Sequence, residues 1–177
     1  MTPQNAAVVI VAAGRGERAR RTGEPDHGPK QYRMIGQNSV IARTVQQFID
    51  HPRIGAIVVV IHADDEALYQ AAMGDLSSAK LLLPAIGGKT RQESVFNGLK
   101  ALAGIEPALV LVHDGVRPFV SDATIERVLA GLEKYQAVLP ALAVADTMKR
   151  VDQQADGGRI IRETVDRSHL WAAQTPQ

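Results

Sequence analysis

The sequence predicts a doubly wound α/β domain, built on a mostly parallel sheet and extended by a protruding β-hairpin arm. Short, uniformly apolar runs, typical of strands buried on both faces, alternate with longer segments of helical period. Glycine-rich or polar residues follow three of these runs directly, at the strand ends where open α/β sheets bind their ligands. Near the end of the chain the periodicity changes to a polar–apolar alternation, which is typical of a hairpin.

The individual elements follow from this periodicity. Strands are expected at residues 7–11, 57–61, 80–83, 109–112 and 137–144. Helices are expected at residues 39–49, 64–73, 90–103 and 122–134. Ser39 and Thr90 are the expected N-cap residues of two of these helices, and Glu93 stands at the capping-box position after Thr90.

The segment after the last predicted strand has the pattern of an arm. Residues 146–151 and 159–165 each alternate polar and apolar side chains, and the turn-rich sequence DQQADGG separates them. A two-stranded hairpin with so little core needs a partner surface to be stable. We therefore predict a single domain over residues 1–177, with a hairpin arm at 142–170 that serves dimerisation.

Composition and charge exclude several classes of protein. The 177 residues include 20 Lys and Arg against 19 Asp and Glu, and the formal net charge of +1 gives no electrostatic basis for binding nucleic acid or a membrane surface. The chain has no Cys, which excludes disulfides and thiolate chemistry and fits a reducing compartment. The apolar run at 6–13 is too short to span a membrane and no basic region precedes it, so we expect a soluble, cytoplasmic protein.

The loop after the first strand is rich in glycine and basic residues. Gly14, Gly16 and Ala19 have the spacing of a dinucleotide fingerprint, but the Pro- and Gly-rich residues 22–29 do not suit the helix that this motif requires. The acidic residue expected at the end of a second strand, about 20 residues on, is also missing. Because glycines expose backbone N–H groups to phosphate and basic side chains neutralise it, a triphosphate fits the loop better. On composition alone, a solvated basic loop fits equally well.

Two further loops are expected at the same edge of the sheet. The sequence GGKT at 87–90 ends like a P-loop, but Leu83 stands where the first glycine of that motif belongs, and a plain strand-to-helix turn is the simpler interpretation. In HDGVRP at 113–118, Asp114 can hold Mg²⁺ or a substrate hydroxyl, and Arg117 can reach a phosphate. A surface ion pair between these two side chains is the alternative. Three such loops at one edge favour a binding site.

Seven short motifs, taken together and in order, resemble those of one enzyme family. They are AAGRGER (12–18), PKQ (29–31), GG (87–88) followed by Arg91 and Ser94, HDGVRP (113–118), DTMKR (146–150), TVDR (164–167) and QTPQ (174–177). The family is the 2-C-methyl-D-erythritol 4-phosphate cytidylyltransferases of non-mevalonate isoprenoid biosynthesis. The resemblance runs from residue 7 to the end of the chain and implies a Rossmann-like nucleotidyltransferase fold.

The resemblance also implies roles for individual residues. The nucleotide-binding set that it assigns is Ala12, Ala13, Gly14, Gly16, Gly88 and Ser94, and the catalytic residues on the triphosphate are Arg18 and Lys30. The set assigned to methylerythritol phosphate is Asp114, Arg117 and Thr175, with Thr147 and Arg167 from the arm of a neighbouring subunit. That last assignment implies a homodimer. Mg²⁺ or another divalent cation is expected on the CTP phosphates, with Asp114 as a candidate protein ligand.

The implied reaction is a direct displacement. A phosphate oxygen of the sugar-alcohol phosphate attacks the α-phosphorus of CTP, and pyrophosphate leaves. Because a phosphate monoester is mostly dianionic at neutral pH, the reaction needs no protein nucleophile and no strong base. Arg18 and Lys30 are the candidates that neutralise the developing charge. The other histidines match no metal-ligand spacing and are expected to be solvated or structural: His27, His51, His62 and His169.

The sequence departs from the family pattern in two places. Lys89 stands where relatives often have an acidic or small residue, and relatives continue beyond Gln177 with a further substrate-binding Lys. We therefore expect a domain that is incomplete at its C-terminus. In some relatives this domain precedes a fused cyclodiphosphate synthase. The alternatives are a ribitol-5-phosphate cytidylyltransferase, a nucleotidyltransferase for a sugar 1-phosphate, and a non-catalytic nucleotide-binding module. The AAG loop and the DTMKR arm favour methylerythritol phosphate.

Overall fold

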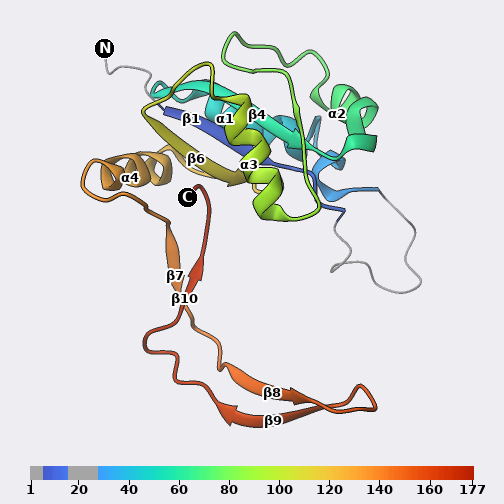
Figure 1. Ribbon diagram of the computed structural model, residues 1–177, viewed down its shortest axis with the longest axis vertical. Coiled ribbons are helices and arrows are strands. Elements are labelled where there is room, and N and C mark those ends of the chain that lie inside the picture. The colour runs from blue at the N-terminus through green and yellow to red at the C-terminus, as the bar shows by residue number, and fades with distance from the viewer. Residues whose placement is uncertain (1–5, 16–27) are drawn as a thin grey trace.

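A four-stranded parallel sheet forms the centre of the protein. The computed structural model describes residues 6–15 and 28–177. The strands lie in the order β5-β4-β1-β6, and every neighbouring pair is parallel (Figure 1). Their bounds are β1 Ala6–Val11, β4 Ile54–Ile61, β5 Ala85–Ile86 and β6 Leu109–Asp114. The predicted α/β class with a mostly parallel sheet is confirmed.

Helices cover both faces of this sheet, as a doubly wound fold requires. They are α1 Val40–Asp50, α2 Glu66–Met73, α3 Arg91–Ala101 and α4 Asp122–Leu132. Alternate strand residues such as Val8, Ile10 and Val59 share a buried cluster with side chains of α1, α2 and α4. The residues between them, such as Val9 and Val58, form a second cluster on the opposite face, where α3 lies (Figure 1).

The beginnings of the helices follow the predicted capping. Ser39 Oγ accepts the backbone N–H of Ala42 at 3.1 Å, and Thr90 Oγ1 accepts that of Glu93 at 3.1 Å. The Glu93 carboxylate differs from the predicted capping box, because it accepts the backbone N–H of Lys89, one residue before the cap, at 2.6 Å. It thereby ties the start of α3 to the preceding loop.

Two 3-10 turns and a small hairpin complete the region near β1. The 3-10 turns are η2 Lys30–Tyr32 and η3 Ala63–Asp65, and the small hairpin is β2 Met34–Ile35 with β3 Asn38–Ser39. The helix predicted from residue 64 thus begins as a 3-10 turn and becomes α-helical at Glu66.

One predicted strand forms only a bridge, and another is shorter than predicted. At 80–83 only Leu81 forms a bridge, to Ile57, while β5 provides the regular pairing with β4 further along the chain. Pro84 follows directly and has no N–H to continue a ladder, and Leu83 turns outward with 87% of its surface exposed. The strand predicted at 137–144 shrinks to β7, Ala141–Ala143, which begins after Pro140.

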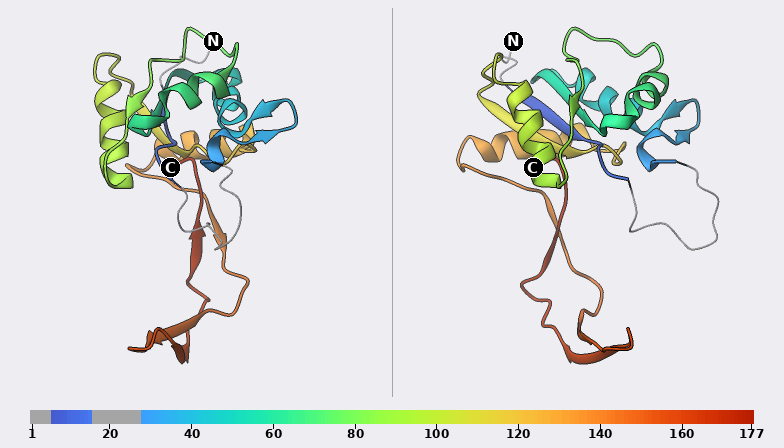
Figure 2. Two further views of the ribbon diagram at one scale, coloured as in Figure 1. Left: turned by 90° about the vertical axis from the view of Figure 1, so that its right-hand side faces the viewer. Right: turned by 45° about the vertical axis from the view of Figure 1, so that its right-hand side comes forward.

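The arm predicted from the alternating pattern is present. β7 pairs antiparallel with β10, Trp171–Ala173, outside the central sheet. Beyond this stem, β8 Lys149–Gln153 and β9 Arg159–Thr164 form the antiparallel hairpin, which projects well away from the sheet (Figure 2). Both strands are exposed along their whole length. No helix in the described ranges is long and apolar enough to cross a membrane.

Candidate functional site

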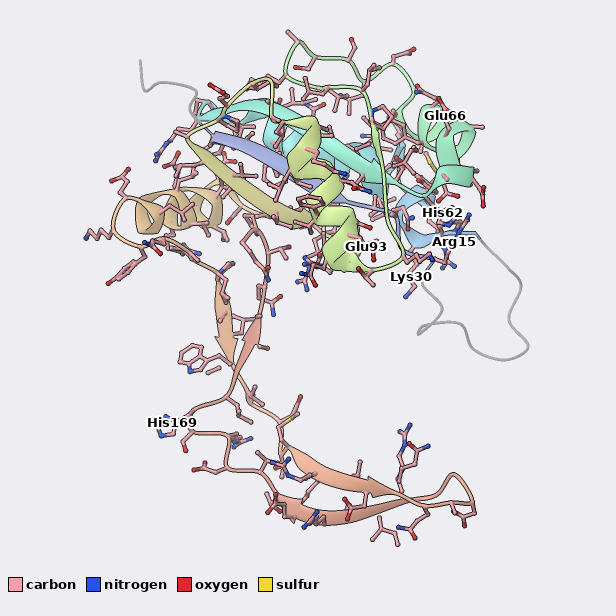
Figure 3. The ribbon with its side chains drawn as sticks, viewed as in Figure 1. Arg15, Lys30, His62, Glu66, Glu93 and His169 are labelled. Carbon is pink, nitrogen blue, oxygen red and sulfur yellow. The ribbon has the colours of Figure 1, made fainter. Side chains whose placement is uncertain are left out.

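A cavity of about 790 Å³ lies at the carboxyl ends of the central strands, where the sequence predicts a crevice. The loops after β1, β4 and β6 and the start of α3 form its wall. Figure 3 labels Arg15, Lys30 and His62 on one side of this region and Glu93, on α3, on the other. The lining includes most of the predicted nucleotide-binding residues: Ala12, Ala13, Gly14, Gly88 and Ser94.

The first loop is held by a buried glutamine. Gln31 is 3% exposed, and its amide Nε2 donates to the carbonyl oxygens of Ala12 at 2.6 Å and Gly14 at 3.2 Å. These bonds fix the loop backbone beside the cavity. The motif PKQ pointed to Lys30, but sequence reasoning missed the role of Gln31. The sequence gives only a weak signal for this role, because a glutamine next to a lysine does not reveal which backbone carbonyl groups its side chain will contact.

The second loop packs directly onto the first. A Cβ at Gly87 would lie 2.5 Å from the Ala13 Cβ, and a Cβ at Gly88 would lie 2.3 Å from the Glu93 Cβ. Only glycine allows these approaches. Ser94 Oγ accepts the Gly88 N–H at 3.1 Å and donates to the Thr90 carbonyl at 2.9 Å. The two loops therefore form a rigid backbone surface that suits a flat base.

The predicted catalytic residues are only partly within the described ranges. Lys30 lines the cavity with an exposed side chain at the start of η2, where a phosphate could meet its ammonium group. The predicted residues Arg18 and Gly16 lie outside the described residues.

The predicted substrate residues of the third loop meet at one corner of the site. Asp114 Oδ2 accepts from Arg117 Nε at 3.0 Å, and Asp114 Oδ1 accepts from Arg91 Nη2 at 2.9 Å. Arg117 also donates to Gln174 Oε1 at 2.5 Å, and Thr175 Oγ1 accepts the Asp114 N–H at 3.4 Å. The surface ion pair considered as an alternative thus exists, but it belongs to a network at the cavity edge.

The return of the chain to the sheet builds this corner. Gln177 and Val112 exchange backbone hydrogen bonds of 2.7 and 2.8 Å, which carries Thr175 to the end of β6. Burial opposes ionisation of Asp114, but the hydrogen bonds from Arg91 and Arg117 outweigh it and hold the pKa of that carboxyl below its usual value. Asp114 is therefore ionised at neutral pH and balances the two guanidinium groups.

The third-loop histidine stabilises this corner from beneath. His113 is fully buried, its Nε2 donates to the Arg117 carbonyl at 3.1 Å, and its ring packs edge-on against Phe48 with centroids 4.9 Å apart. Burial lowers the pKa of the imidazole from 6.5 to about 4. His113 is thus neutral at physiological pH and orients the turn that carries Arg117.

A protein cage for a metal ion does not fit this site. Each Asp114 oxygen already accepts from a guanidinium, and the part of the chain that the structure describes contains no group of three or more metal-ligating side chains. Asp114 as a metal ligand stays a prediction that this geometry does not favour.

The two predicted arm residues flank the β8–β9 hairpin, which projects away from the central sheet (Figure 1). Thr147 is exposed just before β8, and Arg167 is exposed after β9, where its guanidinium donates to the Ala145 carbonyl. The structure of one chain therefore does not bring Thr147 or Arg167 to Asp114.

Comparison with known proteins gives one consistent result. A profile of the family 2-C-methyl-D-erythritol 4-phosphate cytidylyltransferase matches residues 6–177. The bifunctional enzyme IspD/IspF of Brucella abortus biovar 1 (strain 9-941) is 52% identical over 167 residues, which are 94% of this chain and 40% of that protein. The enzyme of the same name from Mesorhizobium japonicum is 52% identical over 171 residues, 97% of this chain and 40% of the relative. The chain thus spans about 40% of the length of these relatives.

Solved structures agree with the sequence relatives. The 2-C-methyl-D-erythritol 4-phosphate cytidylyltransferase (IspD) of Francisella tularensis superposes with a TM-score of 0.74 at 29% identity, over 97% of this chain and 70% of that one. The 4-diphosphocytidyl-2C-methyl-D-erythritol synthase of Anaerococcus prevotii gives a TM-score of 0.73 at 30% identity, over 97% and 67%. The chain belongs to the 2-C-methyl-D-erythritol 4-phosphate cytidylyltransferase family.

Proposed function

We propose that the protein transfers CMP from CTP to 2-C-methyl-D-erythritol 4-phosphate, giving 4-diphosphocytidyl-2-C-methyl-D-erythritol and pyrophosphate for isoprenoid biosynthesis. One observation carries this proposal. A backbone surface suited to a nucleotide and a charged corner suited to a phosphorylated polyol meet at a single cavity. The cysteine-free composition fits action in the reducing cytoplasm.

Each group of residues in the cavity is proposed to bind a different part of the substrates. Ala12, Ala13 and Gly14 face Gly88 and Ser94 across the nucleotide side of the cavity. Lys30 lies at the first loop, where it and Arg18 would meet the triphosphate. Asp114, Arg117 and Thr175 form the corner that would take the methylerythritol phosphate, whose hydroxyl groups suit the carboxylate and whose phosphate suits the guanidinium. Gly16 belongs to the nucleotide side by its place in the loop.

The chemistry is a single displacement. A phosphate oxygen of the acceptor forms a bond to the α-phosphorus of CTP, and the bond from that phosphorus to the bridging oxygen breaks. Pyrophosphate takes the electron pair, and no proton has to leave the attacking oxygen. The protein aligns two polyanions and neutralises them, which is the role of Lys30 and Arg18. Mg²⁺ or another divalent cation would arrive on the triphosphate as part of the substrate.

The arm at 142–170 would complete the site of a second copy. Its strands are exposed along their whole length and carry the exposed apolar side chains Val151, Ile160 and Ile161, and Met148 is exposed just before β8. Such a surface needs a partner. In a homodimer joined through the arms, Thr147 and Arg167 would reach the acceptor phosphate bound by the neighbouring subunit.

The test is release of pyrophosphate from CTP and Mg²⁺ with methylerythritol 4-phosphate or ribitol 5-phosphate, beside a measurement of CTP binding. Release with methylerythritol phosphate alone is the expected result. Release with ribitol phosphate alone would overturn the substrate. CTP binding without release from either acceptor would make the protein a nucleotide-binding module.

A further inference from the structure

The guanidinium of Arg15 is held by three side chains at the end of β4, outside the residues assigned to the proposed reaction. Arg15 Nη1 donates to Asp65 Oδ1 at 2.8 Å, and Nη2 lies 2.7 Å from His62 Nδ1 and 3.1 Å from Asp64 Oδ2. Asp65 is 1% exposed, whereas the Asp64 side chain is 77% exposed. We propose that Arg15 is a positioning residue, whose ion pair with buried Asp65 clamps the first nucleotide loop against the end of β4.

The burial of Asp65 makes the Arg15–Asp65 ion pair costly to break. A buried carboxylate is costly unless a cation compensates it, and removing the cation leaves the charge unbalanced. Asp65 Oδ2 has no hydrogen-bond partner among the described residues, and its polar neighbour is the half-buried Tyr32 side chain, whose hydroxyl pKa is raised by burial and further by Asp65. Within those residues Arg15 is the cation that pairs with the carboxylate, through Oδ1. Release of Arg15 toward a phosphate would leave Asp65 buried without it. The number of basic residues in the loop is therefore larger than the number of cations that the loop can offer to the phosphates of CTP.

The part of the loop from Gly14 onward needs such an anchor because, unlike Ala12 and Ala13, Gly14 has no close packing around it among the described residues. An ideal Cβ at Gly14 would meet no described atom within 4 Å, so the backbone beside Arg15 is open. Gln31 holds the carbonyl oxygens of Ala12 and Gly14 on one side, and the Arg15–Asp65 pair holds the next residue on the other. Together they fix the peptide groups that the proposed function assigns to the nucleotide.

A double-mutant cycle separates positioning from direct contact with phosphate. The variants are Arg15→Gln, Asp65→Asn and their combination, with KM for CTP, kcat and the dissociation constant of CTP as readouts. If Arg15 acts through Asp65, each single change weakens CTP binding by about tenfold, and the combination is no worse than either, because all three remove the same contact. The effect falls on KM more than on kcat.

Direct contact predicts a different pattern. Arg15→Gln would then weaken CTP binding while Asp65→Asn, which frees the guanidinium, would leave it unchanged or tighten it, and this result would overturn the proposal. Additive losses in the combined variant would overturn it as well. Arg15→Lys keeps the charge but loses the fork, so it is expected to restore only part of the affinity.

A control and a second readout keep the test independent of the activity. Asp64→Asn changes the exposed neighbour of Asp65 and is expected to alter CTP binding by less than about twofold, since water replaces the lost contact. The inference rests on the proposed function for its nucleotide, and calorimetric binding of CTP tests it even if no acceptor yields pyrophosphate. Thermal unfolding of Asp65→Asn shows whether a loss arises from the loop or from the whole fold.

Discussion

The cavity and the arm hold their side chains in opposite ways. At the cavity, Gln31, Asp65 and Arg91 each contact a residue from a distant element, and the sheet core fixes all of them. In the arm, the contacts stay within the hairpin, as between Arg150 and Glu163 at 2.6 Å and between Lys149 Nζ and Thr164 Oγ1 at 2.7 Å. The chain's own core therefore defines the geometry of the cavity, whereas the arm is held by contacts within its own hairpin.

Mixing two inactive variants gives the strongest test of this difference. Lys30→Ala removes a charge at the cavity and Arg167→Ala removes one on the arm, and each is expected to lower turnover by roughly 10²-fold, the effect of losing one preorganised charge partner. If the arm acts on the partner subunit, half of the randomly mixed dimers pair one variant with the other and contain one intact site. Activity should then return to about a quarter of the wild-type value in the pyrophosphate assay.

The control is each variant mixed with itself under the same conditions. A mixture that stays at the average of the two variants would show that each arm serves its own chain or none. Near-normal kcat in Lys30→Ala would instead contradict the role assigned to Lys30.

The pH dependence of the free energy of unfolding tests the buried contacts beneath the cavity, through His113. Because the folded pKa of His113 is about 4 and the unfolded value is 6.5, the unfolded state binds more protons between these values. The free energy of unfolding should therefore fall by about 3 kcal/mol from this group as the pH drops from 6.5 to 4, and stay level above 6.5. Chemical denaturation of wild type and His113→Gln across this range measures the difference.

His113→Gln keeps a neutral donor for the Arg117 carbonyl and removes the titration. Burial also lowers the pKa of His51, but that residue is present in both proteins and cancels in the comparison. Parallel pH profiles for the two proteins would show that His113 does not remain neutral in the fold.

Substitution of Gly98 tests how tightly α3 packs against the central sheet. A Cβ at this position of α3 would lie 2.4 Å from Val9 Cγ1 and 2.9 Å from Val60 Cγ2. Gly98→Ala should therefore lower the free energy of unfolding by about 1–3 kcal/mol, although alanine favours a helix. Gly104→Ala is the matched control, since a Cβ there meets no described atom within 4 Å, and a change within about 0.5 kcal/mol is expected. Equal effects at both positions would contradict the close approach of α3.

The smallest effect is expected from the arm. Arg150 and Glu163 keep 60% and 54% of their side-chain surfaces exposed, and the coupling energy of such a pair in a double-mutant cycle should be below about 0.5 kcal/mol. Thermal unfolding of Arg150→Ala, Glu163→Ala and the combination measures it. A coupling well above about 1 kcal/mol would show that a second surface covers this pair in solution.

Much of the fold could be predicted because it depends on local pattern. The uniformly apolar runs became β1, β4 and β6, and Ser39 and Thr90 cap the helices that they were expected to cap. The predicted strand at 80–83, which forms only a bridge, precedes a proline, and the predicted strand at 137–144, which is shorter in the structure, contains one. Pairing at these places depends on N–H groups that the hydrophobic pattern does not register.

The site was predictable as a place and less so as a set of contacts. The expected edge of the sheet holds the cavity, and Asp114, Arg117 and Thr175 meet there. Gln31 and Arg91 stand in the predicted motifs without an assigned role, and Asp65 was not predicted as part of the site. Each of the three acts through a partner on a separate element or loop. Spacing along the chain does not determine such pairs.

The return of the chain to β6 at Gln177 has a consequence for how such enzymes can be altered. The arm leaves the α/β domain after α4 and returns to the edge of the central sheet at β6, so both of its ends are attached to the same domain. A segment inserted in this way can be exchanged or lengthened at little entropic cost to the folding of the domain. Grafting the arm of a relative between Pro140 and Gln174 should therefore transfer its partner preference while leaving nucleotide binding intact, provided that Thr175 still closes the corner beside Asp114.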